Sequence, residues 1–156
     1  MAAVASRISH EDFIDDSSTT LTASSAVATL PATNVATAHV AETWRATGDT
    51  AENLNADLGS AKSVKVAGIF GHNFTSGATV KLQADAAATY DSGGGGLPSY
   101  SLTLTVDTDP LSDVIPKIVV FLDQTYRYWR VNQADGSNPS NYVEIGRWWR
   151  GTYFQP

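Results

Sequence analysis

Few side chains in this sequence stand at the spacings that catalysis requires. The three histidines, His10, His39 and His72, fall in separate segments, and no two of them show the H-x-x-x-H spacing of a metal site. Serine is abundant, but no G-x-S-x-G elbow is present, so a hydrolase nucleophile is not indicated. The acidic neighbours Asp15 and Asp16 fit a turn or a calcium contact better than a catalytic pair. These patterns predict that the chain is not an enzyme.

Tryptophan, tyrosine and arginine crowd the last third of the chain. Such residues act either as core tryptophans with an arginine stacked over the ring, or as hot spots of a protein interface. Trp148 and Trp149 are adjacent, so in a strand they point to opposite faces and at least one of them should leave the core. We therefore predict a protein interface, formed by Trp148, Trp149, Arg150, Tyr153 and Phe154.

Composition excludes several classes of function. The 156 residues suit one domain, and 17% of them are charged, with a net charge of −6. An acidic chain is unsuited to a nucleic-acid groove or a basic membrane surface. The absence of cysteine excludes disulfides, thiolate metal sites and cysteine nucleophiles. No apolar run approaches the roughly 20 residues of a membrane span, and the first residues do not resemble a secretory signal.

Short stretches of alternating apolar and polar residues follow one another along the chain. Turn signals rich in glycine, proline and asparagine separate them, and Leu30-Pro31 indicates a turn or a short helical turn. Seven or eight short strands of this kind indicate an all-β fold, an antiparallel β-sandwich or jelly roll. The predicted strands cover residues 19–23, 52–58, 63–70, 79–84, 101–106, 117–122, 126–132 and 141–150.

The chain divides into three parts on this pattern. Residues 1–16 are predicted to form an N-terminal arm, residues 17–150 a single β-sandwich domain, and residues 151–156 an aromatic C-terminal tail that docks. The four glycines from Gly93 to Gly96 resemble a phosphate-binding loop only superficially, because Leu97-Pro98 follows them instead of a helix. We interpret this run as a flexible loop.

Five short motifs, taken in order, resemble discoidin-type (F5/8 type C, galactose-binding-like) domains. They lie between Trp44 and Gly146, about two thirds of the chain, and their order and spacing carry the resemblance. The resemblance implies a galactose-binding-like jelly roll. The motifs are TWRAT at 43–47, LNADLG at 54–59, VKVAGI at 64–69, YRYWRV at 126–131 and YVEIG at 142–146.

Further details resemble small virion proteins of tailed bacteriophages, which are often encoded among minor tail genes. These are the segments GHNF at 71–74, YWR at 128–130, YVEIGR at 142–147 and FQP at 154–156. The resemblance implies a non-enzymatic virion structural protein, made in the host cytoplasm and located in the tail rather than the head. Its expected partners are other virion proteins and further copies of itself, without nucleic acid or membrane insertion.

Discoidin-type domains also commonly hold a structural calcium and, in some members, bind sugars. Here Thr43 and Glu144 match calcium positions, but the Asp-Gly turn is missing and two ligands fall short of the 6–8 oxygens that calcium takes. We therefore expect no cofactor, and expect Glu144 to act as a strut that hydrogen-bonds an arginine. A glycan site on the loops would use His72, Phe74 and Tyr90.

Three functions remain open from the sequence. The first is a tail component that docks on neighbouring subunits through its aromatic end. The second is a carbohydrate-binding module that attaches the particle to a host glycan, and the third is a capsid decoration protein.

Overall fold

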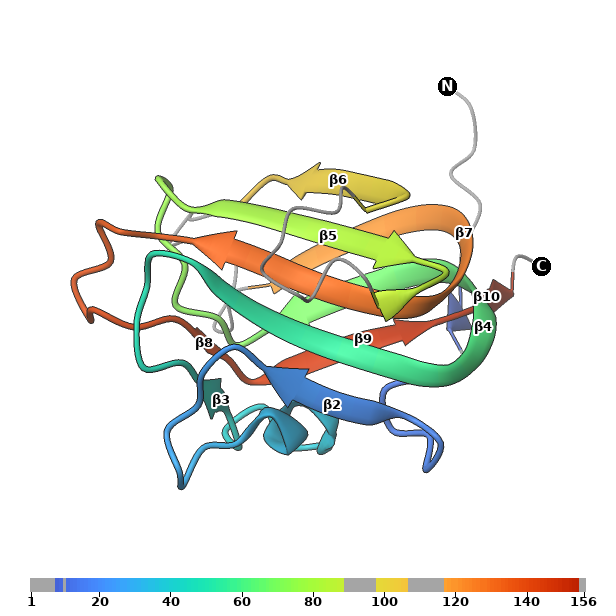
Figure 1. Ribbon diagram of the computed structural model, residues 1–156, viewed down its shortest axis with the longest axis horizontal. Coiled ribbons are helices and arrows are strands. Elements are labelled where there is room, and N and C mark those ends of the chain that lie inside the picture. Colours follow the sequence, from blue (N-terminus) through green and yellow to red (C-terminus); the bar gives the residue numbers. More distant parts are fainter. Residues whose placement is uncertain (1–7, 10, 89–97, 107–116, 155–156) are drawn as a thin grey trace.

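The computed structural model describes residues 8–9, 11–88, 98–106 and 117–154, and shows strands together with a short 3-10 helix (Figure 1). None of the described helical residues forms a span that could cross a membrane. The elements are β1 (Ile8–Ser9), β2 (Thr20–Ala23), η1 (Ala32–Ala36), β3 (Trp44–Arg45), β4 (Glu52–Phe70), β5 (Thr79–Asp85), β6 (Tyr100–Leu104), β7 (Lys117–Ala134), β8 (Glu144–Ile145), β9 (Arg147–Gly151) and β10 (Tyr153–Phe154).

Two long bent strands, β4 and β7, build both layers of a sandwich (Figure 1). The first half of β4 pairs with β2 and with the second half of β7, which continues through β5 to β6. This gives a five-stranded sheet in the order β2-β4-β7-β5-β6. The second half of β4 lies between β9 and the first half of β7, in a three-stranded sheet. All these pairings are antiparallel, so the predicted fold class is confirmed.

Glycine explains how β4 turns from one sheet into the other. Gly59 has a φ of 73°, a conformation that glycine adopts without a steric cost. Pairing with β7 stops at Asp57 and resumes at Lys62. The sequence predicted two strands here, at 52–58 and 63–70, because the turn signal was taken as a break. The same holds for β7, which unites the strands predicted at 117–122 and 126–132.

The last predicted strand, at 141–150, is instead divided into β8 and β9. Gly146 separates them, and a Cβ atom there would lie 2.1 Å from the Val40 carbonyl oxygen. The backbone can therefore pass close to Val40 only because residue 146 has no side chain.

The core between the sheets is dominated by three tryptophans that are fully buried: Trp44, Trp129 and Trp148. Leucine, isoleucine and valine side chains from β4, β5 and β8 fill the space around them. These residues occupy every second position of their strands, so their side chains point towards the core, as the alternation in the sequence predicted.

The N-terminal segment 11–16 packs on this body. Ile14 is buried, and the backbone NH of Phe13 donates to the Arg150 carbonyl at 2.7 Å. At the other end of the chain, β10 pairs with β1. Tyr90, the glycine run 93–96 and residues 107–116 lie outside the described residues, as do residues 1–7 and 155–156.

Candidate functional site

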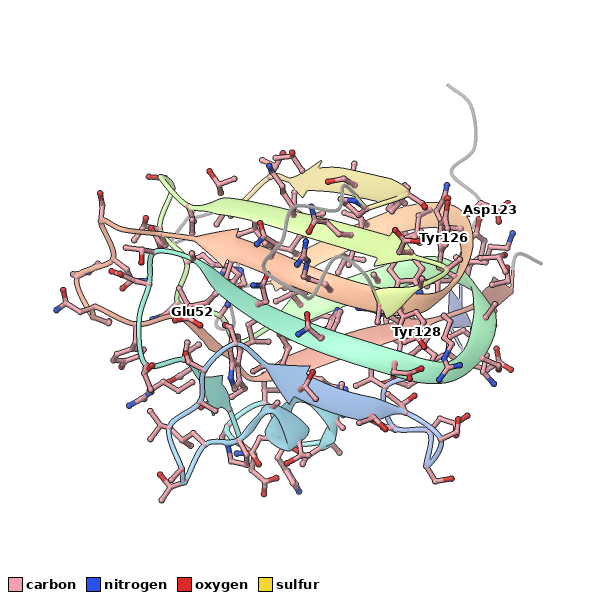
Figure 2. All side chains as sticks on the ribbon, in the orientation of Figure 1. Glu52, Asp123, Tyr126 and Tyr128 are labelled. Carbon is pink, nitrogen blue, oxygen red and sulfur yellow. The ribbon has the colours of Figure 1, made fainter. Side chains whose placement is uncertain are left out.

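Three loops meet at the end of the sandwich where β5 begins and β7 ends. They comprise residues 46–51, 71–78 and 135–142, and together they form what is called here the loop end. In Figure 2 Glu52 marks this end, whereas Asp123 and Tyr126 lie at the opposite end, where the long strands bend. The sequence separates these loops widely, so only the fold brings them together.

A buried aspartate holds two of the three loops. Asp135 is 2% exposed, and its carboxylate accepts hydrogen bonds from the Thr75 NH at 2.8 Å and the Thr75 hydroxyl at 2.6 Å. The Asn138 side-chain amide donates to the same carboxylate at 3.0 Å. The Asp135 NH donates to the Asp49 carbonyl at 2.6 Å, which adds the third loop. A buried carboxylate satisfied in this way fixes the geometry of its surroundings.

Asn73 completes the scaffold. Its Nδ2 donates to the Tyr142 carbonyl at 2.9 Å, and its Oδ1 accepts from the Glu144 NH at 2.8 Å. Asn138 Nδ2 in turn donates to the Asn73 carbonyl at 3.0 Å. The loop after β4 is thereby fastened to the segment that leads into β8, which sets the position of residues 142–144.

On this scaffold Arg45, Tyr142 and Glu144 form a partly exposed group. Nε and Nη2 of Arg45 both contact Glu144 Oε2, at 2.7 and 2.6 Å, and the guanidinium carbon lies 4.2 Å from the centre of the Tyr142 ring. The side chains of Arg45 and Glu144 are 34% and 20% exposed. The group thus offers solvent a cation, a carboxylate and an aromatic ring, which can donate to hydroxyl groups, accept from them and pack against apolar C–H bonds.

The residues that the sequence indicated for glycan binding lie differently. His72 and Phe74 are both 5% exposed, and their rings stack on each other with centres 4.8 Å apart. His72 Nδ1 accepts from the Phe74 NH at 3.3 Å, and burial lowers the pKa of His72 to about 4. Both side chains therefore pack inside the loop end and offer no surface to a ligand. Tyr90 lies outside the described residues.

Two residues of the predicted protein interface are also inside the domain. Trp148 and Arg150 are fully buried, and the Arg150 guanidinium lies 3.6 Å from the Trp148 ring centre and 4.6 Å from that of Trp129. The sequence left two interpretations open for these aromatics, a core tryptophan stacked with an arginine or an interface hot spot. Trp148 is a core tryptophan stacked with Arg150. Its side chain has no surface left for a partner.

Trp149, by contrast, lies on the outer face of the three-stranded sheet and is partly exposed. Tyr153, also partly exposed, belongs to β10 and borders this face through its contact with Phe121. The alternation expected for the two adjacent tryptophans is therefore observed. Phe121 meets Tyr153 edge to face at 5.7 Å, and the Phe70 ring lies over Gly68, where a Cβ would be 2.6 Å from Phe70 Cε2. We name this surface the apolar outer face; it comprises Phe70, Val119, Phe121, Trp149 and Tyr153.

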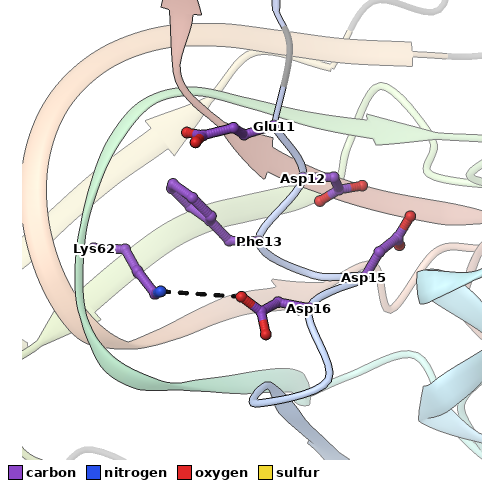
Figure 3. A pocket seen from close by; sticks show the side chains of 6 residues that line it. All are labelled: Glu11, Asp12, Phe13, Asp15, Asp16 and Lys62. Atoms are coloured by element: carbon purple, nitrogen blue, oxygen red, sulfur yellow. Dashed lines mark ion pairs between the residues drawn. The ribbon is translucent and has the colours of Figure 1, made fainter.

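A hollow of about 330 Å³ lies where the N-terminal segment crosses the bend of β4 (Figure 3). Its acidic side chains are engaged within the chain: Arg147 contacts Asp12 at 2.6 Å and Asp15 at 2.8 Å. These ion pairs attach the N-terminal segment to β9. The acidic side chains of the hollow therefore serve to hold this segment in place. The lining residues are Glu11, Asp12, Phe13, Asp15, Asp16 and Lys62.

The two positions that match calcium ligands both face nitrogen donors. Glu144 contacts Arg45, which confirms the predicted strut, and the Asn34 side-chain amide donates to the Thr43 carbonyl at 2.9 Å. Among the described residues no group of three or more histidine and acidic side chains could hold a metal ion. These residues do not fit a calcium site.

Arg45 and Tyr142 were not among the candidate site residues taken from the sequence. Arg45 follows a core tryptophan, so alternation alone places its side chain outside. Tyr142 precedes a buried valine in the same manner. The sequence pattern could not show that these two side chains meet. They are 97 positions apart, and only the pairing of β3 with β8 brings them together.

Comparison with known structures places the fold among carbohydrate-binding modules. Chitosan-binding module 1 of a chitosanase/glucanase from Paenibacillus sp. IK-5 is 20% identical, with a TM-score of 0.62 over 92% of this chain and all of that one. The family 32 carbohydrate-binding module of C. perfringens NanJ, solved with galactose, is 13% identical, with a TM-score of 0.61 over 92% and 98% of the two chains. The lectin binding domain of Lectinolysin, complexed with Lewis b, is 12% identical, with a TM-score of 0.66 over 92% and 98%.

No protein-family model and no curated protein sequence matches this chain. At these identities the likeness to the solved structures is one of fold. The galactose-binding-like β-sandwich expected from the sequence is therefore confirmed, and this chain has the fold of carbohydrate-binding modules.

Proposed function

We propose that this chain is a non-catalytic carbohydrate-binding module that binds a glycan at the loop end. The observation that carries the proposal is the group of Arg45, Tyr142 and Glu144, held by the Asn73 and Asp135 hydrogen bonds. Solved structures of the same fold bind galactose and Lewis b. The ligands to test first are therefore neutral sugars with several hydroxyl groups.

The chemistry of the group suits such a ligand. A sugar ring presents hydroxyl groups at its rim and C–H bonds on its face. Glu144 can accept from a hydroxyl while Arg45 donates to a neighbouring one, and the Tyr142 ring can pack against the C–H face. Because the hydrogen bonds of Asn73 and Asp135 hold the scaffold in place, little conformational entropy should be lost when a ligand binds.

The test is a titration of the protein with a panel of glycans by isothermal calorimetry. The panel contains galactose-terminated, fucosylated and chitosan oligosaccharides. Tyr142→Ala removes the ring but keeps the backbone carbonyl that Asn73 contacts, so the scaffold should persist. We expect its affinity to fall about tenfold or more, as for loss of one aromatic contact.

Tyr128→Ala is the matched control, because Tyr128 is also partly exposed but lies near the bend of the strands, away from Glu52 (Figure 2). It should bind like the unchanged protein. Equal loss in both variants, or no binding to any member of the panel, would contradict the proposal.

We also propose, from the resemblance to virion proteins, that the module is carried on a bacteriophage particle, at the tail. The apolar outer face supports this assembly role, because Val119 and Phe121 are exposed on it and exposed apolar patches mark interaction surfaces. Gold-labelled antibody on purified particles tests it. Label at the tail is expected; label on the head would indicate a decoration protein, and unlabelled particles would refute a place in the virion.

A further inference from the structure

Arg45 and Glu144 form an ion pair between segments that lie 99 positions apart in the sequence. They are direct cross-strand neighbours in the pairing of β3 with β8. Nε and Nη2 of Arg45 lie 2.7 and 2.6 Å from the same oxygen, Oε2 of Glu144. Both side chains are partly buried, so water screens the attraction less than it would at an open surface. The pair therefore links β3 to the segment that enters the last strands.

The guanidinium of Arg45 has a defined position, because its neighbours are themselves held. Its carbon lies 4.2 Å from the centre of the Tyr142 ring. The Asn73 side chain accepts from the Glu144 NH at 2.8 Å and donates to the Tyr142 carbonyl at 2.9 Å. The cation thus stands between a ring and a carboxylate that the loop after β4 keeps in place.

This guanidinium occupies the position that a calcium ion would need at Glu144. Calcium lies 2.3–2.6 Å from its oxygen ligands. Two nitrogens of Arg45 already contact Glu144 Oε2 at closely similar distances. An ion at this oxygen would have to displace the guanidinium, and the two positive charges would repel each other. Arginine also keeps its proton in proteins, so its charge is permanent.

Backbone oxygens on either side of Trp44 are bound by nitrogen donors of the chain as well. The Thr43 carbonyl accepts from the Asn34 side-chain amide at 2.9 Å, and the Arg45 carbonyl accepts from the Val27 NH at 2.9 Å. Each oxygen would have to give up this hydrogen bond to serve as one of the 6–8 ligands of calcium. The stretch before Trp44 also lacks the Asp-Gly turn of calcium-holding relatives.

We propose that the Arg45 guanidinium is an internal cation that takes the place of the structural calcium implied by the resemblance to discoidin-type domains. The loop end is then held together without a metal ion, and Arg45 is a positioning residue for Glu144 and Tyr142. This inference concerns how the loop end is supported. It stands whether or not a glycan binds there.

Thermal unfolding in excess calcium chloride and in excess EDTA is the first test. A calcium site filled at a hundred times its Kd would raise the unfolding midpoint by about 5–10 °C. We expect the two midpoints to agree within about 1 °C. Terbium, a luminescent substitute for calcium, gives a second readout, because Tyr142 would sensitise an ion bound at Glu144. A midpoint that rises with calcium, or terbium emission that Glu144→Gln removes, would overturn the proposal.

Charge-removing variants test the ion pair itself. Arg45→Gln and Glu144→Gln should each lower the unfolding midpoint by about 2–4 °C. The double variant R45Q/E144Q should lose no more than the larger of these, because all three variants remove the same contact. Arg45→Lys keeps a cation and should retain part of the stability. Losses that simply add in the double variant would show that the two side chains act independently.

Hydrogen exchange locates the effect within the molecule. Arg45→Gln should speed the exchange of the Glu144 NH, which donates to Asn73 Oδ1. Arg127→Gln is the matched control, because Arg127 contacts Asp57 at 2.7 and 2.8 Å near the bend of β4 and should leave this amide unchanged. An unchanged Glu144 amide in Arg45→Gln would contradict the positioning role. No readout here needs a glycan, so failure of this proposal is distinguishable from failure of glycan binding.

Discussion

Arg150 shows how single residues of the aromatic C-terminal third divide between core and surface. Its guanidinium lies between the rings of Trp148 and Trp129, and all three side chains are fully buried. A desolvated cation over an indole ring contributes about 2 kcal/mol, more than an exposed one. The neighbouring Trp149 points to the other side of the sheet and leans over Gly151, where a Cβ would lie 3.3 Å from its ring.

The two adjacent tryptophans should therefore respond differently to truncation. Trp148→Ala is expected to lower the free energy of unfolding by about 3–5 kcal/mol, since it empties a fully buried site and removes the stacking partner of Arg150. Trp149→Ala should cost about 1 kcal/mol, because part of its ring already faces water. Urea unfolding followed by circular dichroism measures both. Equal losses in the two variants would contradict this division of roles.

His72 should make the stability of the protein depend on pH. Burial lowers its pKa to about 4, whereas an unfolded histidine titrates near 6.5. Between these values the unfolded chain binds the extra proton, so stability is full above about pH 6.5 and falls as the pH drops towards 4. The loss over this window should amount to about 3 kcal/mol in urea unfolding.

Phe is the matched replacement for His72, because it keeps a ring against Phe74 and cannot titrate. His72→Phe should abolish the loss of stability between pH 6.5 and 4. Asp57→Asn is the control: Arg127 hydrogen bonds hold the pKa of Asp57 below its usual value, so its contribution is lost only below that window. A His72→Phe variant with an unchanged pH profile would contradict the assignment.

Among the secondary-structure elements, the alternation of apolar and polar residues predicted where strands lie, but not where one strand ends or continues into the next. The segments around Leu54, Val80 and Val131 alternate in burial as expected. The bend at Gly59 was taken as the end of a strand, because a turn residue looks the same whether pairing resumes after it or not. Gly146 was missed as a break, because its cause is the approach of Val40, which lies far away in the sequence.

Substitution of Gly146 should therefore destabilise the protein. An alanine Cβ there would lie 2.1 Å from the Val40 carbonyl oxygen, so Gly146→Ala must push the two backbones apart. We expect a loss of about 3 kcal/mol or more in the free energy of unfolding, as for overpacking that meets backbone. At Gly77 the nearest atom to such a Cβ is Thr75 Oγ1 at 3.7 Å, so Gly77→Ala should be nearly neutral. Chemical denaturation of the two variants side by side checks the difference.

At the scale of the whole molecule, the sequence predicted the fold and the strut at Glu144, but not the composition of the loop end. Its scaffold depends on Asn73 and Asp135, whose partners come from other loops. Hydrogen bonds between distant loops leave no periodic signal, so the pattern could not show which side chains face solvent. It consequently favoured His72 and Phe74, which are buried, over Arg45 and Tyr142, which are partly exposed.

A chemical-shift titration of the labelled protein, with the oligosaccharide that binds best, locates the glycan on the molecule. If the glycan binds at the loop end, the amide signals of residues 45–50 and 135–144 move together along one binding curve, and Tyr142→Ala abolishes these shifts. Shifts confined to the outer faces of the sheets, or their persistence in the Tyr142→Ala variant, would contradict binding at the loop end.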